Sequence, residues 1–170
     1  MTAPLTTRPG FGRALAAVRG AEIGLLRAVA LDIVAVGDSD ALHTLGAEAI
    51  DLMRSATGPT AVDLQAHSTV DGRATTFLGR AGRGVAVSGH LSVVAGESRE
   101  PLRASIRLVG THGSVLVDLL RPMLDVRTAA GRTEVPFGPL GDDAAAPEAS
   151  DALSAIAESA RSGRTVTITW

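Results

Sequence analysis

The stretch that decides the fold is LLRAVALDIVAVGDSDALHTLGAEAIDLMR, residues 25–54. Leu25–Val36 is aliphatic almost throughout, which predicts a long β-strand. Gly37–Asp40 supplies turn residues and candidates for a helix N-cap. Ala41–Arg54 has the spacing of an amphipathic helix, whose apolar face consists of Leu42, Leu45, Ala49, Leu52 and Met53. A strand, a turn and a helix are therefore expected in direct succession.

After this helix, turn signals separate a series of strand-like segments. Gly58-Pro59 stops the helix, Asp71-Gly72 is a hairpin signal, Gly79–Gly84 is a Gly-Arg-rich turn, and Gly110–Gly113 joins two more strands. The expected strands are Ala61–Val70, Ala74–Arg80, Val85–Val94, Leu102–Val109, one ending near Leu120, Leu124–Thr128 and Thr133–Phe137. Because their connections are short, we predict an antiparallel meander.

Two further helices are expected, one near each end. The first runs from Phe11 to Arg19. The second follows a loop over residues 138–146, with Pro147 in its first turn and Gly163 at its end. Its predicted buried stripe is Leu153, Ile156, Ala157 and Ala160. With a closing strand at Thr165–Trp170, the pattern predicts an α+β fold: an open, mainly antiparallel β-sheet with helices packed mainly on one face.

Length and composition favour one domain. A chain of 170 residues with 45% hydrophobic content can form one cooperative core. We expect a flexible tail over residues 1–10 and a single domain over residues 11–170. The N-terminus lacks the apolar core of a signal peptide, and no apolar run approaches the roughly 20 residues that span a bilayer. We therefore expect a cytoplasmic protein without a membrane partner.

Charge and residue usage exclude several functions. A net charge of −2 and an aromatic content of 2% disfavour nucleic-acid binding. The chain has no cysteine for a thiolate nucleophile and no lysine for a Schiff base. Its four histidines are scattered, and His-Glu-x-x-His is absent, so no metal site is predicted. Catalysis by this chain would have to use other groups.

The candidate site lies on the polar side of the helix at Ala41–Arg54. Thr44, Glu48 and Asp51 follow one another at i, i+4 and i+7, and His43 is next to them. A carboxylate in a partly desolvated cleft has a raised pKa suited to acid or base catalysis, which makes Glu48 the first catalytic candidate. The alternative is a solvated helix face on which Asp51 pairs with Arg54. Thr44 would then bond to its own helix, and His43 would be exposed.

Four segments resemble the C-terminal domain of the Gfo/Idh/MocA oxidoreductases. Ala14–Gly24 followed by a strand resembles the opening of that domain, and Leu42–Arg54 resembles its first helix. Val109–Val115 is similar to its Gly-containing hairpin, and Ser150–Ile168 to its closing helix and strand. The resemblance, in order over nearly the whole chain, implies an α+β substrate-binding domain. In that family, an N-terminal Rossmann domain supplies the nicotinamide cofactor and a catalytic lysine.

The sequence departs from the family at its active site. The family motif is Asp-x-Gly-x-His-x-x-Asp; Gly46 and Asp51 match it, but Thr44 replaces the first Asp and Glu48 replaces the His. No Gly-x-Gly-x-x-Gly follows a strand and opens a helix. We therefore expect a free-standing domain with no cofactor of its own, NAD(P) entering only with a separate Rossmann partner.

Two functions remain open from the sequence. The first is cofactor-independent acid/base chemistry of lyase, isomerase or cyclase type on a small polar metabolite, of the kind found in specialised metabolism, carried out by Glu48 with Thr44, His43 or Asp51. The second is an accessory or substrate-binding subunit of a split NAD(P)-dependent oxidoreductase; a non-catalytic relic is the remaining alternative. Because the family often assembles through its sheet, the polar strand face of His90 predicts a homodimer.

Overall fold

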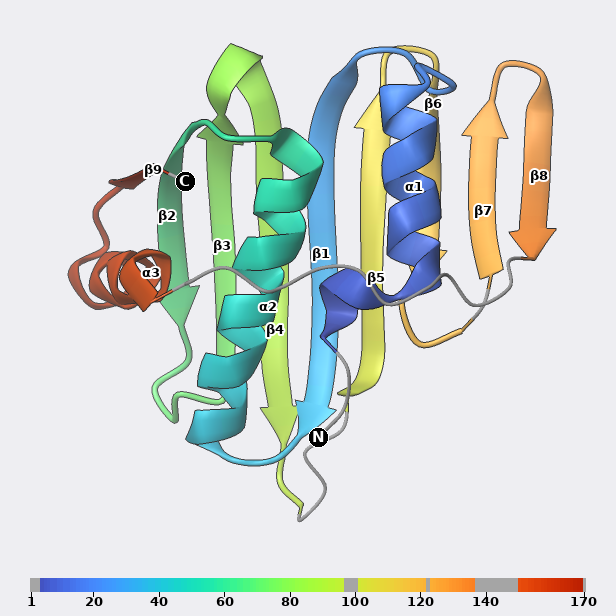
Figure 1. Cartoon of the computed structure of the whole chain (residues 1–170). Coiled ribbons are helices and arrows are strands. Elements are labelled where there is room, and N and C mark those ends of the chain that lie inside the picture. Colours follow the sequence, from blue (N-terminus) through green and yellow to red (C-terminus); the bar gives the residue numbers. More distant parts are fainter. Residues whose placement is uncertain (1–3, 97–100, 122, 137–149, 170) are drawn as a thin grey trace.

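The aliphatic strand predicted at Leu25–Val36 is β1 (Leu26–Val36), which lies in the middle of a nine-stranded sheet. The computed structural model describes residues 4–96, 101–121, 123–136 and 150–169 (Figure 1). Its other strands are β2 (Ala61–Ser68), β3 (Ala74–Ala81), β4 (Val85–Val94), β5 (Pro101–Gly110), β6 (Gly113–Asp118), β7 (Met123–Thr128), β8 (Gly131–Pro136) and β9 (Val166–Thr169). The helices are α1 (Pro9–Arg19), α2 (Ser39–Thr57) and α3 (Ser150–Ser162), with short 3-10 turns η1 (Leu5–Thr7) and η2 (Gly82–Gly84).

The strand order is β8-β7-β6-β5-β1-β4-β3-β2-β9. Every neighbouring pair is antiparallel except β1 and β4, which run parallel with Ala28 opposite Ala86 and Val36 opposite Val94. The predicted fold class, an open and mainly antiparallel α+β sheet, is confirmed. The simple meander is wrong in one respect, because β1 lies between β4 and β5 rather than beside its neighbour in sequence, β2.

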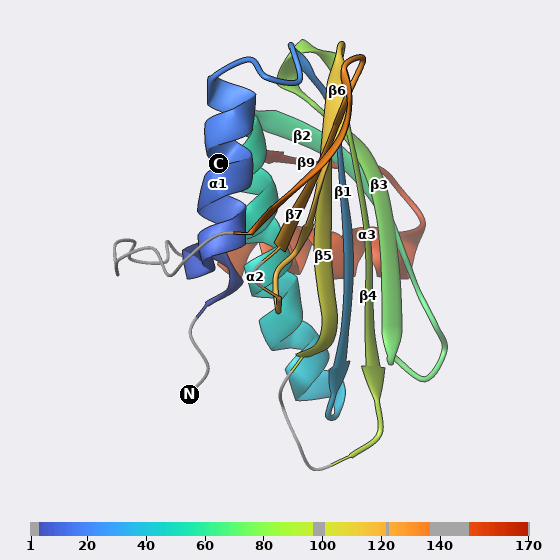
Figure 2. The same ribbon diagram turned by 90° about the vertical axis from the view of Figure 1, so that its right-hand side faces the viewer.

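The helices cover one face of the sheet. α2 packs on β1 and β4, α1 packs on β5, β6 and β7, and α3 packs on β2 and β9. Seen edge-on, α1 and α2 lie on one side, and the opposite face of the central strands carries no described helix (Figure 2). The strands alternate accordingly, with side chains such as Ile33, Leu64 and Ile106 fully buried under the helices. We call the uncovered side the open face.

Polar and glycine residues fix the ends of α2 and α3. The Ala41 N–H donates to Asp38 Oδ1 over 3.1 Å, an N-cap for α2. Gly163, with φ of +68°, ends α3 as predicted. The buried stripe of α3 differs from the prediction, because Ala157 is exposed and Ser159 is fully buried.

The N-terminal residues also differ from the prediction. A flexible tail was expected over residues 1–10, but Leu5 is 1% exposed, η1 packs against α2, and α1 already begins at Pro9. The predicted turn at Gly79–Gly84 is shorter than expected, since β3 continues to Ala81. Phe137, the loop over 138–146, Pro147 and Trp170 lie outside the described residues. In the described part of the chain, no helix is long and apolar enough to cross a membrane.

Candidate functional site

The polar side of α2 borders the N-terminal segment. α2 is held on the sheet by its apolar face, where Ala49, Leu52 and Met53 are fully buried. Thr44 on its other side is exposed, Glu48 is half-buried, and Asp51 is only 7% exposed. This polar stripe therefore runs from the exposed Thr44 to the buried Asp51, and Glu48 between them lies at the contact between α2 and η1.

Glu48 contacts the backbone of η1. The Leu5 N–H donates a hydrogen bond to Glu48 Oε2, with an N to O distance of 3.4 Å. Burial raises the pKa of Glu48 above its ordinary value, while the Leu5 N–H and the Arg8 guanidinium lower it and Asp51 raises it further. Burial is the largest of these effects, so the carboxyl group takes up a proton more readily than an exposed glutamate.

Asp51 lies deeper than Glu48 on the same helix. Burial raises its pKa, and the charge of Arg54 opposes that shift. Arg54 Nη2 lies 3.8 Å from Asp51 Oδ1, so the pair expected for a purely structural helix face is present. Asp51 is nevertheless not solvated, and its Oδ1 makes no hydrogen bond. A buried carboxylate oxygen without a donor is unusual, because desolvation disfavours it.

Arg8 joins this group and was not predicted. It follows η1, acts electrostatically on Glu48, and has a buried Nε without a hydrogen-bond partner. One buried donor, Arg8 Nε, and one buried acceptor, Asp51 Oδ1, thus lie near Glu48 without a hydrogen bond. Water or a polar ligand would satisfy such atoms. Arg8 lies in the predicted flexible tail, where no helical or strand periodicity indicates a site residue.

His43 lies on another side of α2. At 100° per residue it is about 140° around the helix from Glu48. It lines a cavity of about 180 Å³ between α2, α3 and the sheet, together with the hydrogen-bonded pair Ser68 and Thr75, whose hydroxyls are 2.8 Å apart. The structure therefore brings Glu48 and Asp51 together with Arg8, leaves Thr44 one turn away at the surface, and separates His43 from all three.

The other histidines form no site with each other. His67 and His90 are exposed on the open face, where His90 Nδ1 lies 3.1 Å from the Thr76 hydroxyl. His112 bonds to its neighbour Thr111. Within residues 4–96, 101–121, 123–136 and 150–169, no three His, Asp or Glu side chains are arranged to hold a metal ion.

The sequence is matched by no family model and resembles no curated protein, but the fold is shared with solved oxidoreductases. One is levoglucosan dehydrogenase in complex with NADH and L-sorbose, with a TM-score of 0.79, 16% identity, and coverage of 97% of this chain and 64% of that one. Another is an NAD binding oxidoreductase from Klebsiella pneumoniae, with a TM-score of 0.77, 16% identity, and coverage of 99% and 65%.

A third similar structure is an oxidoreductase from Agrobacterium radiobacter in complex with NAD⁺, L-tartaric acid and magnesium. Its TM-score is 0.72, its identity is 18%, and the match covers 95% of this chain and 62% of that one. This chain therefore spans 62% to 65% of the length of these three structures. At such identities the likeness establishes the fold alone.

Proposed function

We propose that this chain, which has the fold of the C-terminal substrate-binding domain of the Gfo/Idh/MocA oxidoreductases, binds a small polar metabolite beside α2 and acts with a nicotinamide-binding Rossmann partner. One observation supports this most directly. Nearly the whole chain superimposes on about two thirds of proteins that were solved with NADH or NAD⁺. The rest of those proteins has no counterpart in these 170 residues. A cytoplasmic location, where such cofactors are available, is part of the same proposal.

The side chains beside α2 suit a polar metabolite. Asp51 Oδ1 can accept and Arg8 Nε can donate, and neither atom makes a hydrogen bond in the structure. Glu48 adds a carboxyl group of raised pKa, and Thr44 adds a hydroxyl at the surface. Hydroxyl groups of a metabolite can both donate to carboxylates and accept from a guanidinium, which matches this set of atoms.

Native mass spectrometry of the protein recovered from its own cells tests the proposal. We expect a stoichiometric complex with a Rossmann-type chain that retains NAD(P)H. A homodimer that carries an organic ligand but no nicotinamide would contradict the partnership and favour the second function below.

The second candidate is cofactor-independent proton transfer by Glu48, as in a lyase, isomerase or cyclase, including reactions of specialised metabolism. The raised pKa of Glu48 favours it, because a general acid or base works best when its pKa is near the pH of the reaction. With the compound identified by mass spectrometry as substrate, Glu48→Gln should lower kcat at least about 100-fold. Unchanged turnover in that variant would exclude the role of Glu48, and no turnover by the native protein would leave a non-catalytic domain.

A further inference from the structure

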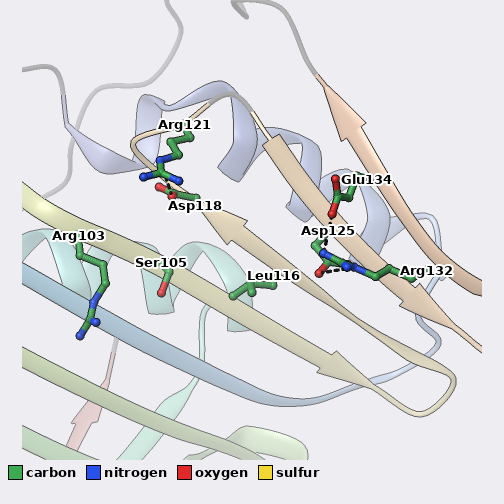
Figure 3. A pocket seen from close by; sticks show the side chains of 8 residues that line it. All are labelled: Arg103, Ser105, Leu116, Asp118, Arg121, Asp125, Arg132 and Glu134. Carbon is green, nitrogen blue, oxygen red and sulfur yellow. Dashed lines mark hydrogen bonds and ion pairs between the residues drawn. The ribbon is translucent and has the colours of Figure 1, made fainter.

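The open face of the sheet has a cavity of its own, which plays no part in the site beside α2. It measures about 310 Å³ and is lined by side chains from β5, β6, β7 and β8 and from the turn after β6 (Figure 3). Ser105 pairs across the strands with Asp118, Leu116 pairs with Asp125, and Asp125 pairs with Glu134. Directly paired residues point to the same side of a sheet, so these side chains rise together from the open face.

One end of the cavity holds a buried carboxylate, Asp125, one oxygen of which has no hydrogen-bond partner. Asp125 is 9% exposed, and its Oδ2 accepts hydrogen bonds from Arg127 Nη2 and Arg132 Nε, both at 3.1 Å. Arg127 and then Arg132 lower the pKa of Asp125, so the group is a carboxylate at neutral pH. Its Oδ1 is buried and has no hydrogen-bond partner. A buried carboxylate oxygen of this kind requires an N–H or O–H donor.

The other end offers guanidinium groups with unused donors. Arg103 Nη2 lies 2.8 Å from Asp32 Oδ2, and Arg121 Nε lies 3.6 Å from Asp118 Oδ2, which is too long for a hydrogen bond. Their side chains are 62% and 80% exposed. A guanidinium has five N–H donors, so each arginine can also bind a carboxylate from outside the chain.

Between the two ends lie Ser105 and Leu116, with the carboxylate of Asp118 opposite Ser105. Figure 3 shows Ser105 and Leu116 between Arg103 and Asp125, with Arg121 and its neighbour Asp118 beside Ser105. The Ser105 hydroxyl makes no hydrogen bond within the described residues, and Leu116 supplies an apolar surface. A ligand that lies along the cavity would therefore contact guanidinium donors at one end, the Ser105 hydroxyl and the Leu116 methyl groups in the middle, and the Asp125 carboxylate at the other end.

We propose that this cavity binds a small organic carboxylate that carries an ammonium or hydroxyl group at its opposite end, such as an amino acid or a hydroxy acid. The ligand carboxylate lies against Arg121, whose guanidinium makes no hydrogen bond within the described residues, its hydrocarbon part covers Leu116, and its donor group reaches Asp125. An ion with only one of the two groups leaves one end of the cavity unmatched. The volume is at the lower limit for ligand pockets, which restricts the ligand to a small metabolite.

The test is a titration of the whole ¹⁵N-labelled chain with 4-aminobutyrate and with gluconate, followed by amide NMR. Butyrate, which lacks a donor group, and butylamine, which lacks a carboxylate, are the controls. We expect saturable shifts confined to β5, β6, β7 and β8, with affinity for at least one bifunctional probe roughly tenfold above both controls. The better probe shows whether the donor is ammonium or hydroxyl.

Three variants locate the binding. Arg121→Met removes an exposed guanidinium, and Asp125→Asn keeps the shape of the acidic end but removes its charge; each should weaken the preferred probe about tenfold. Arg80→Met, an exposed arginine on β3 and outside the cavity, should leave binding unchanged. Because Arg121 is at the surface, its replacement should leave the amide spectrum otherwise native.

The proposal fails if neither bifunctional probe gives saturable shifts, if butyrate or butylamine binds equally well, or if Arg121→Met and Arg80→Met behave alike. It also fails if a second copy of the chain covers the open face and prevents all binding. None of these results bears on the site beside α2, which lies on the helical side of the sheet. The two proposals can therefore succeed or fail independently.

Discussion

Burial acts on Glu48 and Asp51 in the same direction, raising the pKa of both carboxyl groups. A carboxyl group whose pKa is higher in the folded than in the unfolded chain binds its proton more tightly when folded. Its contribution to stability is therefore fully present below the unfolded pKa and is lost as the pH rises through the folded pKa. The contact between η1 and α2 should accordingly weaken from acid toward neutral pH.

The variant Glu48→Gln tests this at a single residue. Glutamine has nearly the same shape, can still accept from the Leu5 N–H, and does not ionise. The ordinary pKa of a glutamate is 4.5. Between that pH and about pH 7.5, the free energy of unfolding of the variant should therefore fall less than that of the native chain. Urea unfolding followed by circular dichroism at several pH values measures the difference.

The exposed residue Glu22 provides the control for that experiment. Glu22→Gln should follow the pH dependence of the native chain. If the stability of Glu48→Gln shows the same pH dependence as that of the native chain, burial does not raise the pKa of Glu48. The physical argument for Glu48 as a general acid or base then fails.

At the residue scale, the sequence identified the carboxylates but not their environment. Helical spacing placed Thr44, Glu48 and Asp51 on one side of α2, and this side is where the structure has them. His43 was grouped with these residues because it is adjacent to Thr44 in the sequence. In the structure its side chain instead lines the cavity between α2 and α3. Arg8 and the Leu5 N–H reach Glu48 across about forty residues of chain, and no local pattern can indicate such a contact. Whether any of these residues is catalytic stays a prediction.

At the scale of elements, one buried hydroxyl connects α3 to the sheet. The Ser159 hydroxyl donates to the Arg164 carbonyl over 2.7 Å and accepts the Ala66 N–H over 2.8 Å. It thereby satisfies a backbone acceptor after α3 and a backbone donor in β2. The sequence prediction treated this side of α3 as purely apolar, because serine in a helix is more often exposed.

We expect Ser159→Ala to lower the free energy of unfolding by about 1–3 kcal/mol, since it leaves the Ala66 N–H and the Arg164 carbonyl without their partner. Ser162→Ala is the matched control, because its exposed hydroxyl donates to the Glu158 carbonyl and accepts from the Arg164 N–H where water can replace it, and its loss should change stability by less than about 0.5 kcal/mol. Equal effects of the two substitutions, measured by urea unfolding, would show that the buried hydroxyl does not connect α3 to β2.

Element types were predictable where the pattern was long, and the partners of β1 were not. α2, β1 and the hairpins from β2 to β4 follow from apolar periodicity and from turn residues such as Asp71-Gly72. Parallel pairing of β1 with β4 depends on how α2 crosses the sheet, which involves residues more than fifty positions apart. Local sequence patterns favour pairing between strands that follow one another along the chain, and they therefore predicted a meander.

At the scale of the whole molecule, the open face has large apolar side chains in contact with solvent. Leu78 on β3 is 62% exposed and Val94 on β4 is 52% exposed. The homodimer predicted from the sequence would cover them, and it stays a prediction. If it forms, Leu78→Glu should weaken self-association at least about tenfold in sedimentation velocity experiments.

Val70→Glu is the control for the dimer, because Val70 is fully exposed in the turn between β2 and β3, away from the middle of the sheet. It should leave self-association unchanged. A native chain that sediments as a monomer at all concentrations, or equal behaviour of the two variants, would exclude a dimer through this face. The fold predicted by family resemblance is confirmed irrespective of that result.

The position of β1 has a consequence for the order of events during synthesis. β1 ends at Val36, yet its two neighbours in the sheet, β4 and β5, begin only at Val85 and Pro101. While the ribosome makes the residues between, this aliphatic segment has no strand to pair with and needs shielding, by early packing against α2 or by a chaperone. Because its pairings close loops of more than fifty residues, folding should be slow and should complete only once β5 has left the ribosome.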